Sequence, residues 1–301
     1  MTDAHDELAD KVGKWVNEEG YPLEYYAANI FQRNGFATAQ GDYSRDTGDV
    51  PREIDVAAWI NFRADGGGLI RLYNVIECKW SRNKPWVVFT SPTTLKKPSA
   101  IVAQTLASRA GETAMWANSG NPDLASLALF ESPASGGFGG RQALSNGQDK
   151  FYDAMRSTIA ASVATVNGYN REIGPSFPEV CVVAFPVIVI DGDLFEAHYD
   201  AQSDALRLER SDHCRCHWRG GGHSPFSTTL DIVTKQGLSA FAERRAADFK
   251  ILGEALRSTF DQLHTSYDAK DPTRVKLHRG ATGMSGHPQL WHQILRRSED
   301  G

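Results

Sequence analysis

Cysteine and long apolar runs are both scarce in this chain of 301 residues. The cysteines are too few and too unevenly spaced for a disulfide framework, which favours a reducing compartment: they are Cys78, Cys181, Cys214 and Cys216. No apolar run approaches the roughly 20 residues that a membrane-spanning helix needs. The first residues, MTDAHDELAD, are acidic and polar, unlike a secretory signal. We therefore expect a cytoplasmic protein with no membrane partner.

The chain also lacks the motifs of several enzyme classes. Its glycine-rich stretches ADGGGL and SGGFGG have neither the strand–loop–helix context nor the Lys-Ser/Thr pair of a phosphate-binding loop. The Gly-x-Ser-x-Gly sequence of serine hydrolases does not occur. An iron–sulfur cluster needs four grouped cysteines, whereas Cys78 and Cys181 fall in predicted core strands. We expect neither a cofactor-binding loop nor an iron–sulfur cluster.

The segment DHCRCHWRGGGH, which ends at His223, gathers histidine and cysteine without the spacing of a common zinc site. Its Cys-x-Cys pair is closer than the usual gap between zinc-binding cysteines. Side chains alternate along a strand, so Cys214 and Cys216 would face one side and His213 and His217 the other. We do not favour zinc here, although the sequence leaves metal binding by this segment open.

Acidic residues are absent between Cys78 and Gly111, although the whole chain has a formal net charge of −5. The basic residues of this window are Lys79, Arg82, Lys84, Lys96, Lys97 and Arg109. Trp80, Trp86 and Phe89 lie among them. Such a local positive field attracts an anionic partner, and the alternative is an ordinary solvated surface. Four of the basic side chains are predicted to contact nucleic acid: Arg82, Lys84, Lys96 and Lys97.

Hydrophobic periodicity predicts one α/β domain in which helices flank a mixed sheet. Helices are expected at residues 4–18, 22–35, about 99–117, about 147–166 and 237–260. Strands are expected at residues 36–39, 52–62, 68–80, 179–190, 192–200, 206–220 and 228–234, with 192–200 as the hairpin partner of the buried strand 179–190. The domain is expected to cover residues 1–268, with a large insertion at about 81–146 and a polar tail at 269–301. We expect SGGFGG, within the insertion, to be flexible.

The stretch LYNVIECKW places charged side chains in an otherwise apolar strand. A turn centred near Gly66 joins it to the strand REIDVAAWINF and pairs positions whose numbers add to about 132. Asp55 and Glu77 then lie opposite each other, where like charges are destabilising unless a positive charge lies between them. Lys79 faces the same side as Glu77. A divalent cation is the other natural partner, and oxygen ligands favour magnesium or manganese. The alternative is a surface ion pair.

The order of these elements resembles the PD-(D/E)xK, or restriction-endonuclease-like, nuclease superfamily. The matching segments are PLEYYAANIFQRNGF for the helix with a glutamate, REIDVAAW for the aspartate strand and VIECKW for the Glu-x-Lys strand. The helix GQDKFYDAMRSTIAASVATV and the strand VCVVAFPVIVI are similar to the elements that follow in that fold. The resemblance covers roughly residues 5–200. Two departures are the long insertion after the Glu-x-Lys strand and Ile54 in place of a proline before the aspartate.

The resemblance implies a Mg²⁺- or Mn²⁺-dependent nuclease. Asp55 and Glu77 would hold the ion, with the backbone carbonyl of Cys78 as a further ligand. Lys79 would orient or help deprotonate the attacking water and stabilise charge on the phosphate, and Glu24 would complete the site through water or a second ion. A glutamate in the first turn of a helix also complements the helix dipole, which is the alternative for Glu24. By analogy we expect cleavage of DNA, in restriction or antiviral defence.

Further polar residues could lie near this site on the helices after the Glu-x-Lys strand, or could be solvated helix positions: Gln104, Gln148 and Lys150. No helix-turn-helix or zinc-finger signature is visible, so targeting would come from the insertion, from a homo-oligomer or from a partner protein. The rival to a nuclease is a catalytically silent binding module that keeps the nuclease fold.

Overall fold

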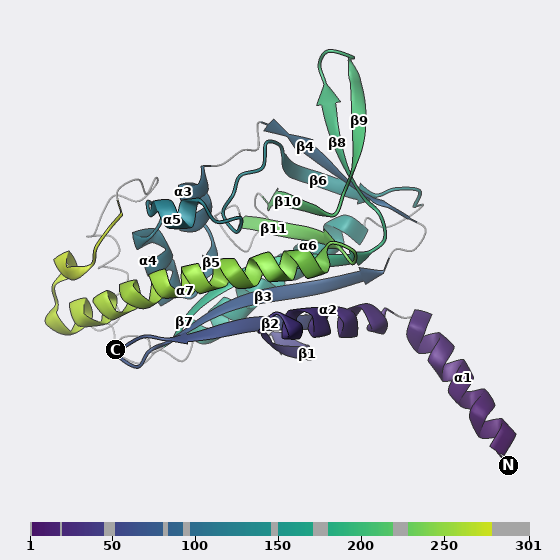
Figure 1. The fold of residues 1–301 in the computed structure, drawn as a ribbon, viewed down its shortest axis with the longest axis horizontal. Coiled ribbons are helices and arrows are strands. Elements are labelled where there is room, and N and C mark those ends of the chain that lie inside the picture. The colour runs from purple at the N-terminus through teal and green to yellow at the C-terminus, as the bar shows by residue number, and fades with distance from the viewer. Residues whose placement is uncertain are drawn as a thin grey trace.

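The computed structural model describes residues 2–18, 20–44, 52–80, 84–92, 97–145, 150–170, 180–218 and 228–278 (Figure 1). Its helices are α1 (Thr2–Glu18), α2 (Tyr21–Arg33), α3 (Pro98–Ala103), α4 (Arg109–Ala117), α5 (Pro122–Ala125), α6 (Lys150–Asn170), α7 (Leu238–Ala269) and the short 3₁₀ helix η2 (Pro272–Arg274). Its strands are β1 (Ala37–Ser44), β2 (Arg52–Arg63), β3 (Leu69–Trp80), β4 (Trp86–Ser91), β5 (Leu106–Ala107), β6 (Gly136–Gln142), β7 (Val180–Asp191), β8 (Leu194–Asp200), β9 (Ala205–Ser211), β10 (His213–Trp218) and β11 (Thr228–Thr234).

These strands form one mixed sheet of eleven strands, as expected for an α/β fold. The order is β1-β2-β3-β7-β11-β10-β6-β4-β8-β9, and the short strand β5 pairs with β7. β7 runs parallel to both β3 and β11. Its ten residues between the two ends are all buried, which confirms the prediction of a strand covered on both faces.

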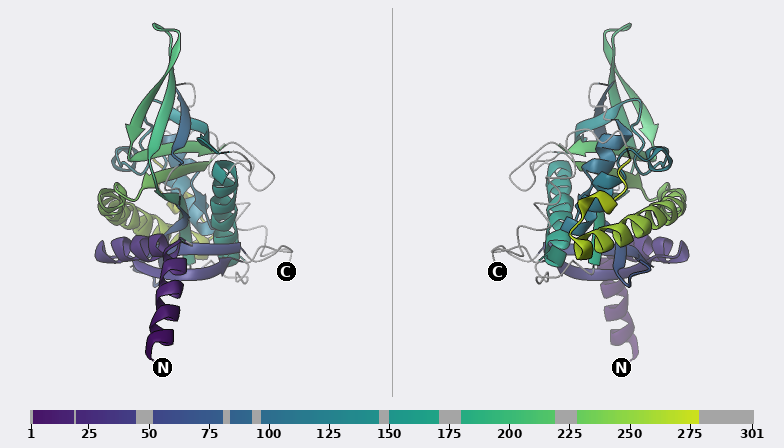
Figure 2. Two further views of the ribbon diagram at one scale, coloured as in Figure 1. Left: turned by 90° about the vertical axis from the view of Figure 1, so that its right-hand side faces the viewer. Right: turned by 90° about the vertical axis from the view of Figure 1, so that its left-hand side faces the viewer.

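Helices cover the two faces of this sheet (Figure 2). On one face, α2, α4 and α7 pack on side chains of β2, β3 and β7 in the largest apolar cluster, which contains Phe31, Ile76 and Phe249. On the other face lies α6, whose Phe151 and Met155 pack against the second cluster. The expected helix near 147–166 and the long C-terminal helix are thereby confirmed, within the described residues.

The expected continuous helix at 99–117 is wrong, because a short strand interrupts it. β5 pairs with Ala184 and Val183 of β7, beside the stretch of β7 that pairs with β11. Ser108 then accepts a hydrogen bond from the Val182 N–H at 3.0 Å, and its own N–H donates to the Val182 carbonyl. These bonds satisfy backbone groups at the edge of β7 that a continuous helix would leave without partners.

The expected flexibility of SGGFGG is also wrong, because most of this stretch belongs to β6. β6 pairs with β4 on one side and with β10 on the other. A Cβ atom on Gly137 would lie 2.6 Å from the Cys216 sulfur, and one on Gly140 would lie 2.4 Å from the Phe151 ring. Glycine is needed here because neighbouring side chains occupy the space of a side chain.

The expected hairpin between 179–190 and 192–200 does not form. β3 and β11 already occupy the two edges of β7 there, so β8 pairs instead with β4 and β9. The single strand expected at 206–220 is divided at Asp212 into β9 and β10, which lie far apart in the order of strands.

The expected insertion at about 81–146 contains β4, β5 and β6. These strands belong to the same sheet as the rest of the chain.

Two elements project from the body of the molecule (Figure 1). The helix α1 extends from one end, and its apolar residues Leu8, Val12 and Trp15 are exposed. The β8–β9 hairpin extends from the opposite side and is called the β8–β9 arm below. Within the described ranges, no helix combines the length and the hydropathy needed to cross a membrane.

Candidate functional site

The register of the β2–β3 hairpin agrees with the prediction from the sequence. Val56 pairs with Ile76 and Trp59 with Tyr73, so paired residue numbers add to 132 as expected. The turn is closed by a hydrogen bond from the Ala64 N–H to the Gly68 carbonyl at 2.9 Å. The regular ladder ends at Val56 and Ile76, and the next residues of the two strands are Asp55 and Glu77.

The Asp55 carboxylate turns towards β3 at this point. Its Oδ2 atom accepts a hydrogen bond from the backbone N–H of Cys78 at 2.7 Å. The thiol of Cys78 packs against the main apolar cluster, and burial raises its pKa well above the ordinary value. Cys78 therefore contributes backbone groups here, whereas its side chain stays a neutral part of the core.

Lys79 and Glu77 form an ion pair, which confirms that they share one side of β3. Glu77 is only 8% exposed, and Lys79 is about one-third exposed. Burial lowers the pKa of the Lys79 ammonium, but the charge and hydrogen bond of Glu77 and the charge of Asp55 together outweigh it, so the net shift is upward. Lys79 is therefore charged at neutral pH and presents part of that charge to solvent.

Glu24 reaches the same place from the first turn of α2. This helix begins after Gly20, whose φ of 89° is a left-handed conformation that favours glycine. Leu23, Ala27 and Phe31 hold α2 in the core and so bring the first turn towards the strand ends. Burial, and then the charge of Asp55, raise the pKa of Glu24 from 4.5 to about 7.

Negative charge at this site is only partly compensated. Burial, and then the neighbouring Glu77 charge, raise the pKa of Asp55 from 3.8 to about 6. The Cys78 N–H and the Lys79 ammonium act in the opposite direction but do not cancel these two effects. The site therefore has more carboxylate charge than its neighbours can stabilise, which is the situation that a bound cation relieves.

The donor set fits a hard divalent cation by its chemistry. It consists of the carboxylates of Glu24, Asp55 and Glu77, and oxygen ligands of this kind suit magnesium or manganese. In this conformation Glu77 is turned to Lys79, and one oxygen of Asp55 is occupied by the Cys78 N–H. Among the described residues, no three histidine, cysteine or acidic side chains are gathered closely enough to hold a metal. Binding would therefore require these carboxylates to turn towards a common point.

The other predicted site residues are spread over several elements. Lys84 is exposed two residues before β4, and Lys97 is exposed at the start of α3. Gln104 ends α3, and Lys150 begins α6. The remaining predicted residues lie outside the described ranges: Arg82, Lys96, Gln148 and His223.

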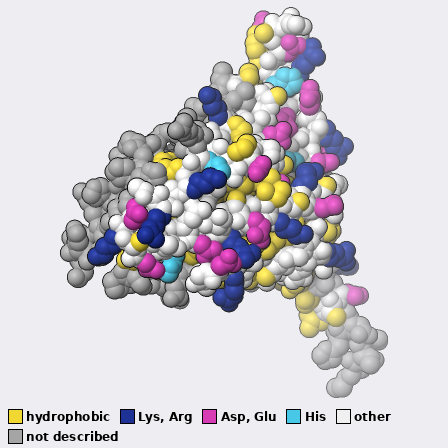
Figure 3. All heavy atoms as spheres, turned by 60° about the vertical axis from the view of Figure 1, so that its left-hand side comes forward, with side chains coloured by type: hydrophobic (Ala, Val, Ile, Leu, Met, Phe, Trp, Pro, Cys, Tyr) yellow, Lys and Arg dark blue, Asp and Glu magenta, His cyan; other side chains and the backbone are white. Residues whose placement is uncertain are grey.

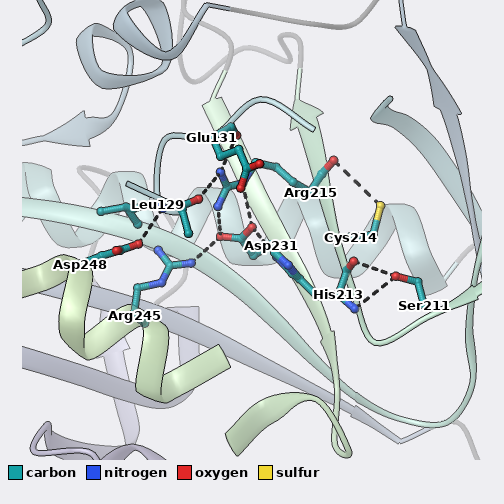
Figure 4. Close-up of polar contacts among 10 residues, drawn as sticks. Leu129, Glu131, Ser211, His213, Cys214, Arg215, Asp231, Arg245 and Asp248 are labelled. Carbon is teal, nitrogen blue, oxygen red and sulfur yellow. Dashed lines mark hydrogen bonds and ion pairs between the residues drawn. The ribbon is translucent and has the colours of Figure 1, made fainter. Parts of the chain in front are cut away.

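The segment considered for zinc instead contributes to a buried charge network (Figure 4). Asp231 on β11 is 4% exposed and accepts hydrogen bonds from Arg215 Nε at 2.9 Å and from Arg245. His213 Nε2 lies 2.9 Å from the same carboxylate. Cys214 packs on the opposite side of β10, in the second apolar cluster, as the alternation predicted. We call Asp231, His213, Arg215 and Arg245 the Asp231 network.

The two arginines of the Asp231 network also connect separate elements. Arg215 Nη1 donates to the backbone carbonyls of Ala128 and Glu131 at 3.0 and 2.8 Å. Arg245 lies over the rings of Phe185 and Phe241, at 5.4 and 4.6 Å from their centroids. The network therefore joins β10, β11, α7 and the segment before β6, which is a structural role.

Sequence reasoning missed this network. The available signal was Asp231 within the apolar strand TTLDIVT, which resembles the signal that identified Asp55. A cavity of about 300 Å³ opens beside the network, and its wall includes the oppositely charged Glu131, Glu196 and Arg244. Mixed charges of this kind do not select a ligand of one sign.

Comparisons with known proteins identified no relative of this chain. No family model matches the chain, and neither the curated proteins nor the solved structures include a similar one.

Proposed function

We propose that this protein is a metal-dependent nuclease with a restriction-endonuclease-like fold, and that the ends of β2, β3 and α2 form its active site. The observation that carries this proposal is the meeting of Asp55, Glu77 and Lys79 where the β2–β3 ladder ends, with Glu24 beside them. Three carboxylates and an ammonium in one partly exposed place are the groups that phosphodiester hydrolysis needs.

In this proposal Asp55 and Glu77 hold the cation, together with the Cys78 carbonyl. A divalent ion bound there would supply a nucleophilic water at neutral pH and neutralise phosphate charge. The Lys79 ammonium, fixed by Glu77, would contact a phosphate oxygen and stabilise the charge that develops on it. Glu24 would orient the water or help to hold a second ion, because α2 holds its carboxylate near Asp55.

DNA is the proposed substrate, and the exposed Lys84 and Lys97 are proposed phosphate contacts. They belong to the acid-free part of the sequence, which sets them apart from the mixed charge of the remaining chain. Contacts of this kind would bind the backbone without reading its sequence. A role in restriction or antiviral defence is proposed by analogy alone.

Cleavage assays test the proposal directly. We expect the protein to cut at least one of supercoiled plasmid, linear duplex, single-stranded DNA or RNA when magnesium or manganese is present, and none with a chelator. Asp55→Asn and Lys79→Ala should each slow cleavage by about a hundredfold or more. Lys250→Ala, at an exposed position on α7, is the matched control and should cut at the wild-type rate.

Two outcomes would contradict this assignment. Cleavage that survives Asp55→Asn would place the activity elsewhere in the molecule. No cleavage of any of the four substrates with either metal would favour the rival, a silent binding module, for which the closed Lys79–Glu77 pair is the supporting observation.

A further inference from the structure

The outer strand of the β8–β9 arm is an exposed edge. Among the strands that the structure describes, β9 has β8 as its one neighbour, and its residues 205–210 are all exposed. Leu206 and Leu208 expose 65% and 62% of their surface. The arm stands clear of the body in all three ribbon views (Figures 1 and 2). An accessible edge with apolar side chains is a template for pairing with another chain.

One face of the arm carries its exposed apolar side chains together with Arg210, and the other face is charged. Leu206 pairs with Tyr199 across the arm and Leu208 with Ala197, so these four residues share a face. Arg207 and the other odd-numbered residues of β9 point to the opposite face. Hydrophobic and charged side chains are visible together on the arm at the top of Figure 3.

The charged face of β9 has alternating signs. Arg207 pairs with Asp200, and Glu209 lies 3.9 Å from His198, all within the same arm. These groups are exposed on β9, where ion pairs contribute little by themselves. The charges of Arg207 and Glu209 can therefore favour one register over others when a second strand pairs with β9.

We propose that the edge of β9 pairs with β9 of a second copy of this chain, antiparallel, with a two-fold axis midway between Leu208 and its copy, called an axis at Leu208 below. Directly opposed residues in an antiparallel pair share a face, so the two-fold axis must oppose one residue to its own copy and lie midway between them. An axis at Leu208 places this leucine opposite its copy. It also places Arg207 opposite Glu209 twice, once on each side of the axis.

The neighbouring registers are less favourable. An axis at Arg207 opposes two arginines, and an axis at Glu209 opposes two glutamates, which is destabilising for like charges at directly opposite positions. An axis at Leu206 opposes Arg207 to Ala205. Glu209 then lies opposite the turn before β9 and has no strand residue facing it. The register centred on Leu208 is therefore selected by its two Arg207–Glu209 pairs, with Leu208 against its copy at the centre.

The resulting assembly would be a four-stranded antiparallel sheet built from two arms. Its symmetry is isologous, the commonest arrangement of soluble homodimers. Each copy contributes a single short strand, so the interface is below the size of a permanent one, and association should depend on concentration. This inference does not rest on the proposed nuclease activity, because it uses no residue of that site.

Charge reversal in solution tests the register. In sedimentation velocity over a range of concentrations, the full chain should show a monomer–dimer equilibrium. Glu209→Arg opposes arginines twice, so we expect about tenfold weaker self-association, or about 1.4 kcal/mol. The double variant Arg207→Glu with Glu209→Arg exchanges the charges and should restore dimerisation. A monomer at every concentration, or a dimer unaffected by Glu209→Arg, would overturn the proposal.

Disulfide trapping gives a second, geometric test. Leu208→Cys would place two thiols opposite each other, with Cα atoms about 4.5–5.5 Å apart, which is within the range of disulfide-bonded cysteines. Leu206→Cys is the matched control, because its two copies would be four residues apart along the strands, about 13 Å. On mild oxidation, Leu208→Cys should give a covalent dimer on a non-reducing gel and Leu206→Cys should not. Equal or faster cross-linking of Leu206→Cys would rule out this register.

Discussion

Asp55 and Asp231 are both aspartates in apolar strands of one sheet, yet their surroundings differ in charge. Burial alone would raise the pKa of Asp231, but the charges of Arg215 and Arg245 hold it well below the usual value. At Asp55, burial and the Glu77 charge prevail, and the pKa rises to about 6. One carboxylate is stabilised as an anion by the fold, and the other is not.

The difference separates a structural charge from a candidate functional one. A buried carboxylate with several hydrogen bonds and two guanidinium partners joins elements and has no capacity left for a ligand. Two neighbouring carboxylates repel each other, and a bound cation relieves this repulsion, so such a pair is a candidate binding site. The four predictions below test this comparison in order of decreasing effect.

Removing the charge of Asp231 should have the largest effect on stability. Asp231→Asn removes the carboxylate that both buried arginines bind and leaves the weaker interaction with Asp248 as the acidic neighbour of Arg245, so we expect a loss of about 3–5 kcal/mol in the free energy of unfolding by urea. Asp193→Asn is the control, because it breaks an exposed aspartate–arginine pair, with Arg210, and should cost at most about 1 kcal/mol. Similar losses in both variants would refute the structural role of Asp231.

Divalent cations should stabilise the protein through Asp55. At a hundredfold excess over the dissociation constant, calcium or magnesium should add about 2.7 kcal/mol to the free energy of unfolding. Asp55→Asn should abolish this gain, and Lys79→Ala should retain it because both ligands remain. Calorimetric titration with calcium measures binding in the three proteins. Wild-type affinity in Asp55→Asn would show that the paired carboxylates do not form the metal site.

Without metal, the two regions should respond to pH in opposite directions. The folded-state pKa of Asp55 is raised, so its contribution favours folding below about pH 4 and is lost as the pH rises through about 6. One pKa unit corresponds to about 1.4 kcal/mol, and partial solvent access reduces the total to about 1–2 kcal/mol. Urea unfolding in chelator from pH 4 to 7 should therefore have a flatter pH dependence in Asp55→Asn.

The Asp231 contribution has the opposite sign. Its folded-state pKa is lowered, so its stabilisation is present above the unfolded pKa near 4 and is lost as the pH falls towards the folded value. For Asp55, the contradicting result would be a free energy of unfolding that changes equally with pH from 4 to 7 in the wild type and in Asp55→Asn. The charge of Asp55 would then not be uncompensated in the folded protein.

The smallest effect is expected from His213. It is the most exposed member of the Asp231 network, and both arginines remain bound to Asp231 without it. His213→Gln should therefore cost about 0.5–1.5 kcal/mol, the value of one hydrogen bond. Urea unfolding at pH 7 measures it, and a loss as large as that of Asp231→Asn would mean that the arginines alone do not stabilise the carboxylate.

Local patterns predicted the part of the fold around the candidate site. The β2–β3 register, the helix that carries Glu24 and the buried strand β7 follow from periodicity, turn residues and apolar runs. The same methods failed in the insertion. Over 99–117, helix propensity predicted one helix, but pairing of β5 with the edge of β7 interrupts it. The glycines of β6 looked like a flexible stretch, but they are needed for close packing against Cys216 and Phe151.

The sequence by itself determined the neighbourhood of Asp55, Glu77 and Lys79, because one tight turn joins their strands and the two-residue period of a strand sets their sides. Only the tertiary structure decided that Asp231 meets Arg215 and Arg245, which come from different elements and are brought together by packing of α7 on the sheet. It also decided that β8 pairs with β4 and β9 rather than with β7, and that β9 lies at the edge of the described sheet. Strand order depends on which edges other strands already occupy. Periodicity describes which face of an element is buried, but it does not name the partner that buries it.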